Sequence, residues 1–176
     1  MMLFKLYFVS AFLLIFSLGK AQSSIDNSIK PENDSNHSIT IPNIGISIIP
    51  PKYFKPSEKF PGFIHEGSAS SITFSREEGT PYLFLNSNKI KESFVNQGIE
   101  FISKQKIKTN RNKHGILYTL AFTIENIRFI RLLYITGDYN TIVIVNANYP
   151  EIAKDILHDV LLQSIRSVTF NSPYNE

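Results

Sequence analysis

The chain has 176 residues, no cysteine and a formal net charge of +3. The lack of cysteine excludes disulfides, thiolate metal sites, a thiol nucleophile and a lipid-modified cysteine. The length suits one domain with a hydrophobic core of its own.

The first 21 residues have the pattern of a cleavable secretory signal peptide. Lys5 precedes an apolar run over 6–18, and the small residues Gly19 and Ala21 stand where a signal peptidase requires them. The run is shorter than the roughly 20 apolar residues that span a bilayer. We therefore predict cleavage after Ala21 and a periplasmic or secreted protein without a transmembrane segment. A retained membrane anchor is the alternative.

Cleavage would leave 155 residues and would remove Lys5 and Lys20, so the formal charge falls from +3 to +1. Bulk charge then gives no reason to expect a nucleic-acid partner. Residues 22–40 are rich in Ser, Asn and Asp and contain no aromatic residue. Such a segment buries too little apolar surface to fold. It is predicted to be a flexible leader, with a single domain over 41–176.

The first predicted strand covers 44–49 and ends at Pro50 and Pro51, because proline cannot continue a strand ladder. An aromatic, proline-rich loop follows over 50–63 and contains Tyr53, Phe54, Phe60 and Phe63. Rigid aromatic loops often anchor protein interfaces, so these four residues are candidate binding residues. The alternative is that they fold back and cap one end of a sheet.

The centre of the chain changes from strand to helix and back again. Strands are predicted over 70–75 and 80–85. A helix should then begin at Asn86 or Ser87. Its buried face is predicted from the spacing of six residues, namely Ile90, Phe94, Val95, Gly98, Phe101 and Ile102.

The remaining elements predict a β-meander and a second helix. Strands are expected over 104–109, 115–124, 127–136 and 141–147, with turns at 125–126 and 137–140. Pro150 is typical of a helix start, and a last strand is expected over 165–170. The predicted buried stripe of that helix consists of Ile152, Ile156, Leu157, Val160 and Leu161. The fold class is α+β, with an antiparallel sheet of about six to seven strands and helices packed on it.

Seven basic residues stand in the segment 89–113, against Glu92 and Glu100. Lys104, Lys106 and Lys108 alternate, so they project from one side of a strand. They are candidate binding residues for an anionic glycan, a lipid headgroup or an acidic protein. The alternative is an edge strand whose lysines prevent aggregation.

Arg128 and Arg131 differ in parity and should point to opposite faces of one strand. We expect each of them to reach solvent or to pair with a carboxylate. Anion binding is the alternative for these arginines.

No sequence motif of a serine hydrolase, zinc protease, nucleotide-binding loop or dinucleotide-binding fold occurs in the chain. No catalytic residue, metal ligand or cofactor is therefore assigned. His65 and Glu66 are the pair that a hydrolase would use if burial or a charged neighbour tuned them. His158 and Asp155 share a helical face, and this pair is interpreted as solvated rather than metal-binding.

The order of elements resembles the PsbP family, whose wider superfamily includes a Ran-binding nuclear import factor and the periplasmic DcrB proteins. The resemblance covers about 41–170. It rests on GISIIPPKYF at 45–54, FPGF at 60–63, SITF at 71–74, QGIEFISKQKI at 97–107, the hairpin 115–136, VNANYP at 145–150 and IRSVTF at 165–170.

This resemblance implies an α-β-α sandwich and a non-catalytic role in binding an envelope or secreted protein or in assembly. The alternatives are a small-ligand or lipid carrier and a hydrolase centred on His65 and Glu66. The oligomeric state stays open.

Overall fold

The computed structural model describes residues 37–79, 82 and 89–170. The predicted strand at 80–85 and the predicted helix start at 86–87 lie outside these residues, apart from Tyr82. The described elements are β1 (Ile39–Ile41), β2 (Ile46–Ile48), β3 (Lys55–Pro56), β4 (Gly62–His65), η2 (Glu66–Ser68), β5 (Ser70–Glu78), α2 (Lys89–Asn96), β6 (Glu100–Lys108), β7 (His114–Ile124), β8 (Ile127–Gly137), β9 (Thr141–Pro150), η3 (Glu151–Ala153), α3 (Lys154–Arg166) and β10 (Thr169–Phe170).

The described strands form two antiparallel sheets, and the larger one confirms the predicted antiparallel sheet of six to seven strands. The larger sheet has seven strands in the order β3-β4-β5-β9-β8-β7-β6, and the smaller sheet has the order β1-β2-β10. β1 includes Ile39 and Thr40, which the sequence pattern places in the leader. These two residues pair with Ile48 and Ser47 of β2, so backbone pairing extends the fold into a segment of polar composition.

The long hairpins form because their turns suit the twist of the strands. Glu125 and Asn126 join β7 to β8 with φ values of 48° and 65°, and two positive φ values are what a two-residue hairpin turn needs. Between β8 and β9, the Oδ1 atom of Asp138 accepts hydrogen bonds from the backbone N–H groups of Asn140 at 2.9 Å and Thr141 at 2.8 Å. Both turns confirm the predicted meander.

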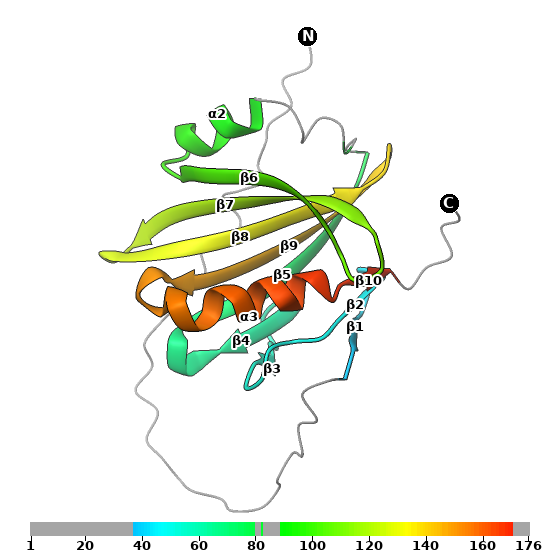
Figure 1. Cartoon of the computed structure of the whole chain (residues 1–176), viewed down its shortest axis with the longest axis horizontal. Coiled ribbons are helices and arrows are strands. Elements are labelled where there is room, and N and C mark those ends of the chain that lie inside the picture. The colour runs from blue at the N-terminus through cyan, green and yellow to red at the C-terminus, as the bar shows by residue number, and fades with distance from the viewer. Residues whose placement is uncertain (1–36, 80–81, 83–88, 171–176) are drawn as a thin grey trace, which may run out of the picture. The chain divides into compact units, whose positions relative to one another are not determined.

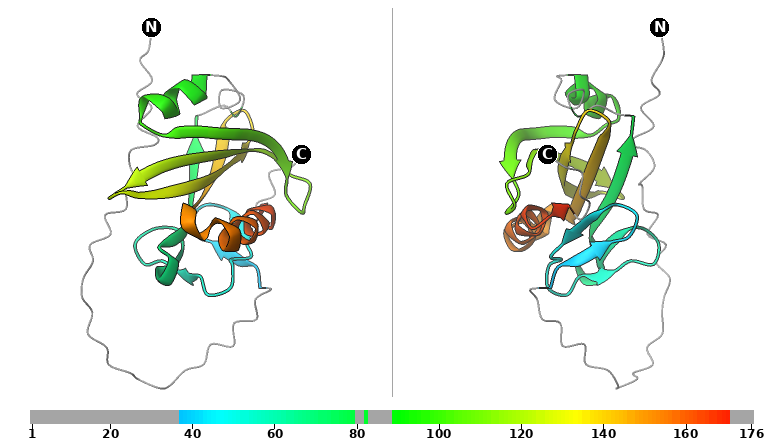
Figure 2. Two further views of the ribbon diagram at one scale, coloured as in Figure 1. Left: turned by 60° about the vertical axis from the view of Figure 1, so that its left-hand side comes forward. Right: turned by 90° about the vertical axis from the view of Figure 1, so that its right-hand side faces the viewer.

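The two α-helices among the described residues pack on opposite faces of the seven-stranded sheet, which gives the predicted α-β-α layering. Phe94 of α2 meets Tyr118 of β7 edge to face at 5.7 Å between ring centroids. On the other face, His158 of α3 meets Tyr149 of β9. Figure 1 shows α3 crossing in front of the sheet and α2 above β6, and Figure 2 shows the same arrangement from two further directions.

The main hydrophobic core lies between the sheet and α3. Alternate residues of β7, β8 and β9 point into it, and β2 and α3 close it from the other side. Its members include Leu117, Leu132, Val145, Leu161 and Ile165. At the C-terminal end of α3, Ser164 donates to the carbonyl of Ile49 at 2.6 Å and Ser167 accepts from the Ile49 N–H at 2.8 Å.

The predicted helix 86–102 is too long at its C-terminal end. α2 ends at Asn96, and Gly98 has a φ of +73°. The Ile99 N–H bonds back to the Phe94 carbonyl at 3.0 Å, so Gly98 terminates the helix instead of extending its buried face. Phe101 and Ile102 consequently belong to β6.

The predicted stripe of the second helix is also wrong in part. Ile152 is 97% exposed, Ile156 is 75% exposed and Val160 is exposed, whereas Leu161 is fully buried. Ile152 lies in η3, whose 3₁₀ turn has three residues. A 3.6-residue period counted from Pro150 is therefore out of phase with α3. The observed buried face carries Leu161, Ser164 and Ile165.

Candidate anion-binding surface

The predicted lysine strand is the edge strand β6, which pairs with β7 alone in the described sheet. Lys104, Lys106 and Lys108 are exposed and stand opposite Tyr118, Ile116 and His114. Ile107 between them points to the other face and joins the main core. Alternation along the strand thus directs Ile107 into the core and the three lysines to the other face, where the Nζ atom of Lys104 lies 5.7 Å from the centre of the Tyr118 ring.

The turn after β6 adds two more cations and is held in place by backbone hydrogen bonds. The N–H of Thr109 donates to the Lys113 carbonyl at 3.0 Å, and the N–H of Asn112, at a φ of 60°, donates to the Thr109 carbonyl at 2.9 Å. The Asn110 N–H donates to the carbonyl of Arg166 at 2.8 Å. The last bond ties the turn to the end of α3.

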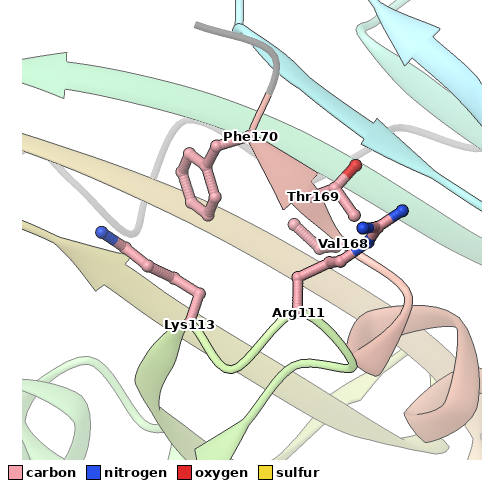
Figure 3. A pocket seen from close by; sticks show the side chains of 5 residues that line it. All are labelled: Arg111, Lys113, Val168, Thr169 and Phe170. Atoms are coloured by element: carbon pink, nitrogen blue, oxygen red, sulfur yellow. The ribbon is translucent and has the colours of Figure 1, made fainter. Parts of the chain in front are cut away.

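Arg111 and Lys113 line an open pocket of about 450 Å³ together with Val168, Thr169 and Phe170. Figure 3 shows the two basic side chains leaving the turn in different directions, Arg111 toward Val168 and Thr169 and Lys113 past the Phe170 ring. The Nζ atom of Lys113 lies 5.2 Å from the centre of the Phe170 ring, a cation–π distance that restrains the lysine chain. The pocket therefore combines two cationic groups with an apolar wall.

We call the exposed cations of this region the basic hairpin surface: Lys104, Lys106, Lys108, Arg111 and Lys113. The sequence contains no acidic residue between Glu100 and Glu125, so the hairpin carries no carboxylate of its own. The charge of Lys113 also affects the pKa of Asp138. Hydrogen bonds from the Asn140 and Thr141 backbone lower its pKa, and the charges of Lys113 and Arg76 lower it further.

Three of the four predicted aromatic binding residues belong to the protein interior. Phe54, Phe60 and Phe63 are buried, and Phe63 packs edge to face with Phe74 at 6.1 Å. Tyr53 is 65% exposed. These three residues follow the stated alternative: β3 and β4 fold the loop back against the sheet, so its apolar side chains face inward. Tyr53 alone of the four remains available on the surface.

His65 and Glu66 do not form a joint site in the described residues. The His65 ring stacks on Phe54 at 5.5 Å, and its Nδ1 atom lies 2.7 Å from the Ser68 hydroxyl, which donates to Ser70 at 2.9 Å. Glu66 starts η2 and is exposed. The His65 side chain therefore stabilises the turn around η2 by hydrogen bonding to the Ser68 hydroxyl.

His158 is half-buried, not solvated as its helix pattern indicates. Its Nδ1 atom lies 2.6 Å from the hydroxyl of Tyr149, a fully buried residue whose pKa burial raises to about 12. The histidine thus supplies a hydrogen-bond partner to a buried phenol. The described ranges contain no group of three or more His, Asp or Glu residues that could hold a metal ion.

Arg128 and Arg131 point to opposite faces, as their parity predicts. Arg128 bonds to Glu100 at 2.8 Å and Glu151 at 3.1 Å. Arg131 does not pair with a carboxylate among the described residues. Its Nε donates to Asn148 Oδ1 at 2.7 Å, and its guanidinium lies 4.7 Å from the Phe122 ring centre.

The sequence pattern identified the lysine strand but not the pocket beside it. In the sequence, Arg111 and Lys113 only contribute to a local excess of basic residues. Residues 168–170 are only part of the predicted last strand. Their meeting depends on the bond between Asn110 and Arg166, which joins residues far apart in the chain.

No family model and no curated protein sequence matches the chain. Solved structures do match it. The cyanobacterial PsbP (CyanoP) of Synechocystis sp. PCC 6803 aligns with a TM-score of 0.56 and 10% identity over 81% of this chain and 97% of CyanoP. LpqN of Mycobacterium tuberculosis, described as involved in cell envelope biogenesis, aligns with a TM-score of 0.54 and 9% identity over 77% of this chain and 90% of LpqN.

At these identities the similarity concerns the fold. In the part of the chain that the structure describes, no helix is long and apolar enough to cross a membrane. The two alignments cover most of this chain and almost all of each solved structure. The protein has the PsbP-like fold.

Proposed function

We propose that this protein is an exported, non-catalytic binding module of the cell envelope whose protein partner presents an acidic segment to the basic hairpin surface. The observation that carries the proposal is the set of exposed cations from Lys104 to Lys113, two of which, Arg111 and Lys113, line a pocket. Export rests on the secretory pattern of residues 1–21. The envelope setting is supported by the fold shared with LpqN.

The geometry favours an extended acidic segment over a compact anion. Lysines two residues apart on a strand stand about 7 Å from one another, a spacing at which alternate carboxylates of an extended peptide can follow them. The Phe170 ring beside Lys113 offers one apolar contact at the end of this row. Binding of this kind is dominated by charge and weakens as salt is added.

The test compares two triple variants that change the net charge equally. Lys106→Glu, Arg111→Glu and Lys113→Glu reverse the basic hairpin surface. Lys52→Glu, Lys55→Glu and Lys59→Glu reverse three exposed lysines of the 50–63 loop. The probe is a labelled acidic peptide, followed by fluorescence anisotropy at low and physiological salt. The hairpin variant should bind at least tenfold more weakly than the wild type, and the loop variant should bind like the wild type.

Equal losses in both variants would mean that the probe reads bulk charge, and this result would contradict the proposal. Anionic phospholipid vesicles and a sulfated polysaccharide serve as further probes in the same assay. If either binds the hairpin surface more tightly than the peptide does, the partner is a membrane or a glycan and the proposal of a protein partner fails.

A further inference from the structure

Arg131 is a half-buried cation that has no anion to neutralise it among the described residues. It lies in the centre of β8, next to β7 and β9, and its Cα partners are Leu120 and Asn148. Burial lowers its pKa to about 10, which still leaves the guanidinium charged at neutral pH. A charge removed from water without a counter-ion is costly. Arg128 on the opposite face, whose side chain is 38% exposed, has two carboxylate partners.

The surroundings of Arg131 fix its guanidinium in one orientation. The Nε–H donates to Asn148 Oδ1 at 2.7 Å, and the Asn148 amide lies 3.5 Å from the Ser71 hydroxyl. The Phe122 ring supports the guanidinium at 4.7 Å and stacks on Phe129 at 5.7 Å. The bond to Asn148 occupies Nε and leaves the two terminal nitrogens, Nη1 and Nη2, as donors. A guanidinium held in this way is prepared to bind an oxyanion.

The strand register shows that Arg131 belongs to a polar row on one face of the sheet, and Asn146 and Thr73 add two more polar residues in the neighbouring row. The row across the sheet starts with Phe101 and Leu120 and continues with Arg131, Asn148 and Ser71. This is the face on which α2 packs through Phe94 and Tyr118. Ser71 is buried and Arg131 and Asn148 are half-buried, so each polar group of this row costs free energy unless it has a hydrogen-bond partner.

We propose that Arg131, Asn148 and Ser71 form a binding site for a small oxyanion, a carboxylate or a phosphate group, on the α2 face of the sheet. The anion accepts hydrogen bonds from Nη1 and Nη2 of Arg131 and from the Asn148 amide. The Phe122 and Phe129 rings lie beside it, so a ligand with an apolar part next to its charged group gains additional contact. The site is separate from the basic hairpin surface and does not depend on it.

The decisive variant is Asn148→Asp, which changes one amide to a carboxylate of the same shape. The new carboxylate keeps the acceptor for Arg131 Nε and supplies the missing negative charge internally. We expect the melting temperature to rise and anion binding to fall at least tenfold. Arg131→Gln should also abolish binding. Arg128→Gln is the control, because it removes an arginine from the opposite face of the same strand and should leave anion binding unchanged.

The probes are inorganic phosphate, acetate and octanoate, titrated into protein carrying Arg111→Gln and Lys113→Gln so that the pocket at the hairpin turn does not contribute. The readout is the NMR signal of the Arg131 Nε–H group together with the thermal shift. Tighter binding of octanoate than acetate assigns an amphiphilic carboxylate, and tighter binding of phosphate assigns a phosphate group. The proposal is overturned if no probe shifts the Arg131 signal saturably, or if Asn148→Asp binds the probes as well as the wild type.

Discussion

Tyr53 and Phe54 are neighbours in the sequence but have opposite environments. Tyr53 is exposed with a φ of 70°, whereas Phe54 is buried and stacks on the His65 ring. The composition of the 50–63 loop predicts that its aromatic residues matter, but composition cannot decide which of them face inward. That choice depends on the pairing of β3 with β4, a contact that leaves no periodic signal in so short a segment.

Phe54→Ala should lower the free energy of unfolding by about 3–4 kcal/mol, because it removes a buried ring and leaves a cavity. Tyr53→Ala should change it by no more than about 0.5 kcal/mol. Urea unfolding followed by circular dichroism measures both values. A neutral Phe54→Ala variant would show that this ring contributes little to the core and would reopen its role at an interface.

At the level of elements, α3 shows where periodicity succeeds and where it fails. The helix is predicted in the right part of the chain, and Leu161 is buried as expected. The face is misassigned because η3 precedes the helix and because two serines, Ser164 and Ser167, occupy inward positions. Their hydroxyls bond to the backbone of Ile49. A search for hydrophobic periodicity does not detect buried polar residues. These two serines can be buried because the backbone of a distant residue, Ile49, provides their hydrogen-bond partners.

Leu161 and Ile156 are side chains of equal size in α3, and truncating each of them tests which face of the helix is buried. Leu161→Ala should cost about 2–5 kcal/mol of unfolding free energy, because Leu161 fills the core. Ile156→Ala should cost less than about 0.5 kcal/mol, because Ile156 is exposed. Chemical denaturation of the two variants distinguishes them. Similar losses in both would mean that the helix is rotated relative to the arrangement described.

For the whole molecule, the meander from β7 to β9 is predictable because each turn joins neighbours in the sequence. The three-stranded sheet is not, because β10 pairs with β2 across more than 100 residues. The same distinction applies to the candidate sites. The lysine strand follows from local alternation, whereas the pocket at Arg111 and the row at Arg131 depend on which strands become neighbours.

Three buried tyrosines should make the whole fold sensitive to alkaline pH. Burial raises the pKa of Tyr118, Tyr134 and Tyr149 to about 12, whereas an unfolded tyrosine titrates near 10. Between these values the folded chain holds protons that the unfolded chain has lost. Stability is therefore complete below pH 10 and falls as pH rises toward 12, by at most about 1.4 kcal/mol per pH unit for each tyrosine.

Unfolding free energies measured from pH 9 to 11.5 test this expectation. Tyr149→Phe should reduce the slope of the unfolding free energy against pH. The substitution also removes the hydrogen bond to His158. Tyr139→Phe is the matched control, because Tyr139 is 81% exposed, and its slope should equal that of the wild type. Identical slopes for all three proteins would argue against a contribution of Tyr149 to the pH dependence.

The pairing of β2 with β10 also determines when the protein can finish folding. β2 lies near the beginning of the described chain, and its partner ends at Phe170. Ile49 likewise acquires its serine partners only from the end of α3. A chain that is still being synthesised can contain the central meander before it contains the residues that complete the second sheet. Closing so long a loop is slow compared with forming local hairpins. The last step of folding therefore waits until β10 has been synthesised, and deletion of Thr169 and Phe170 removes that step.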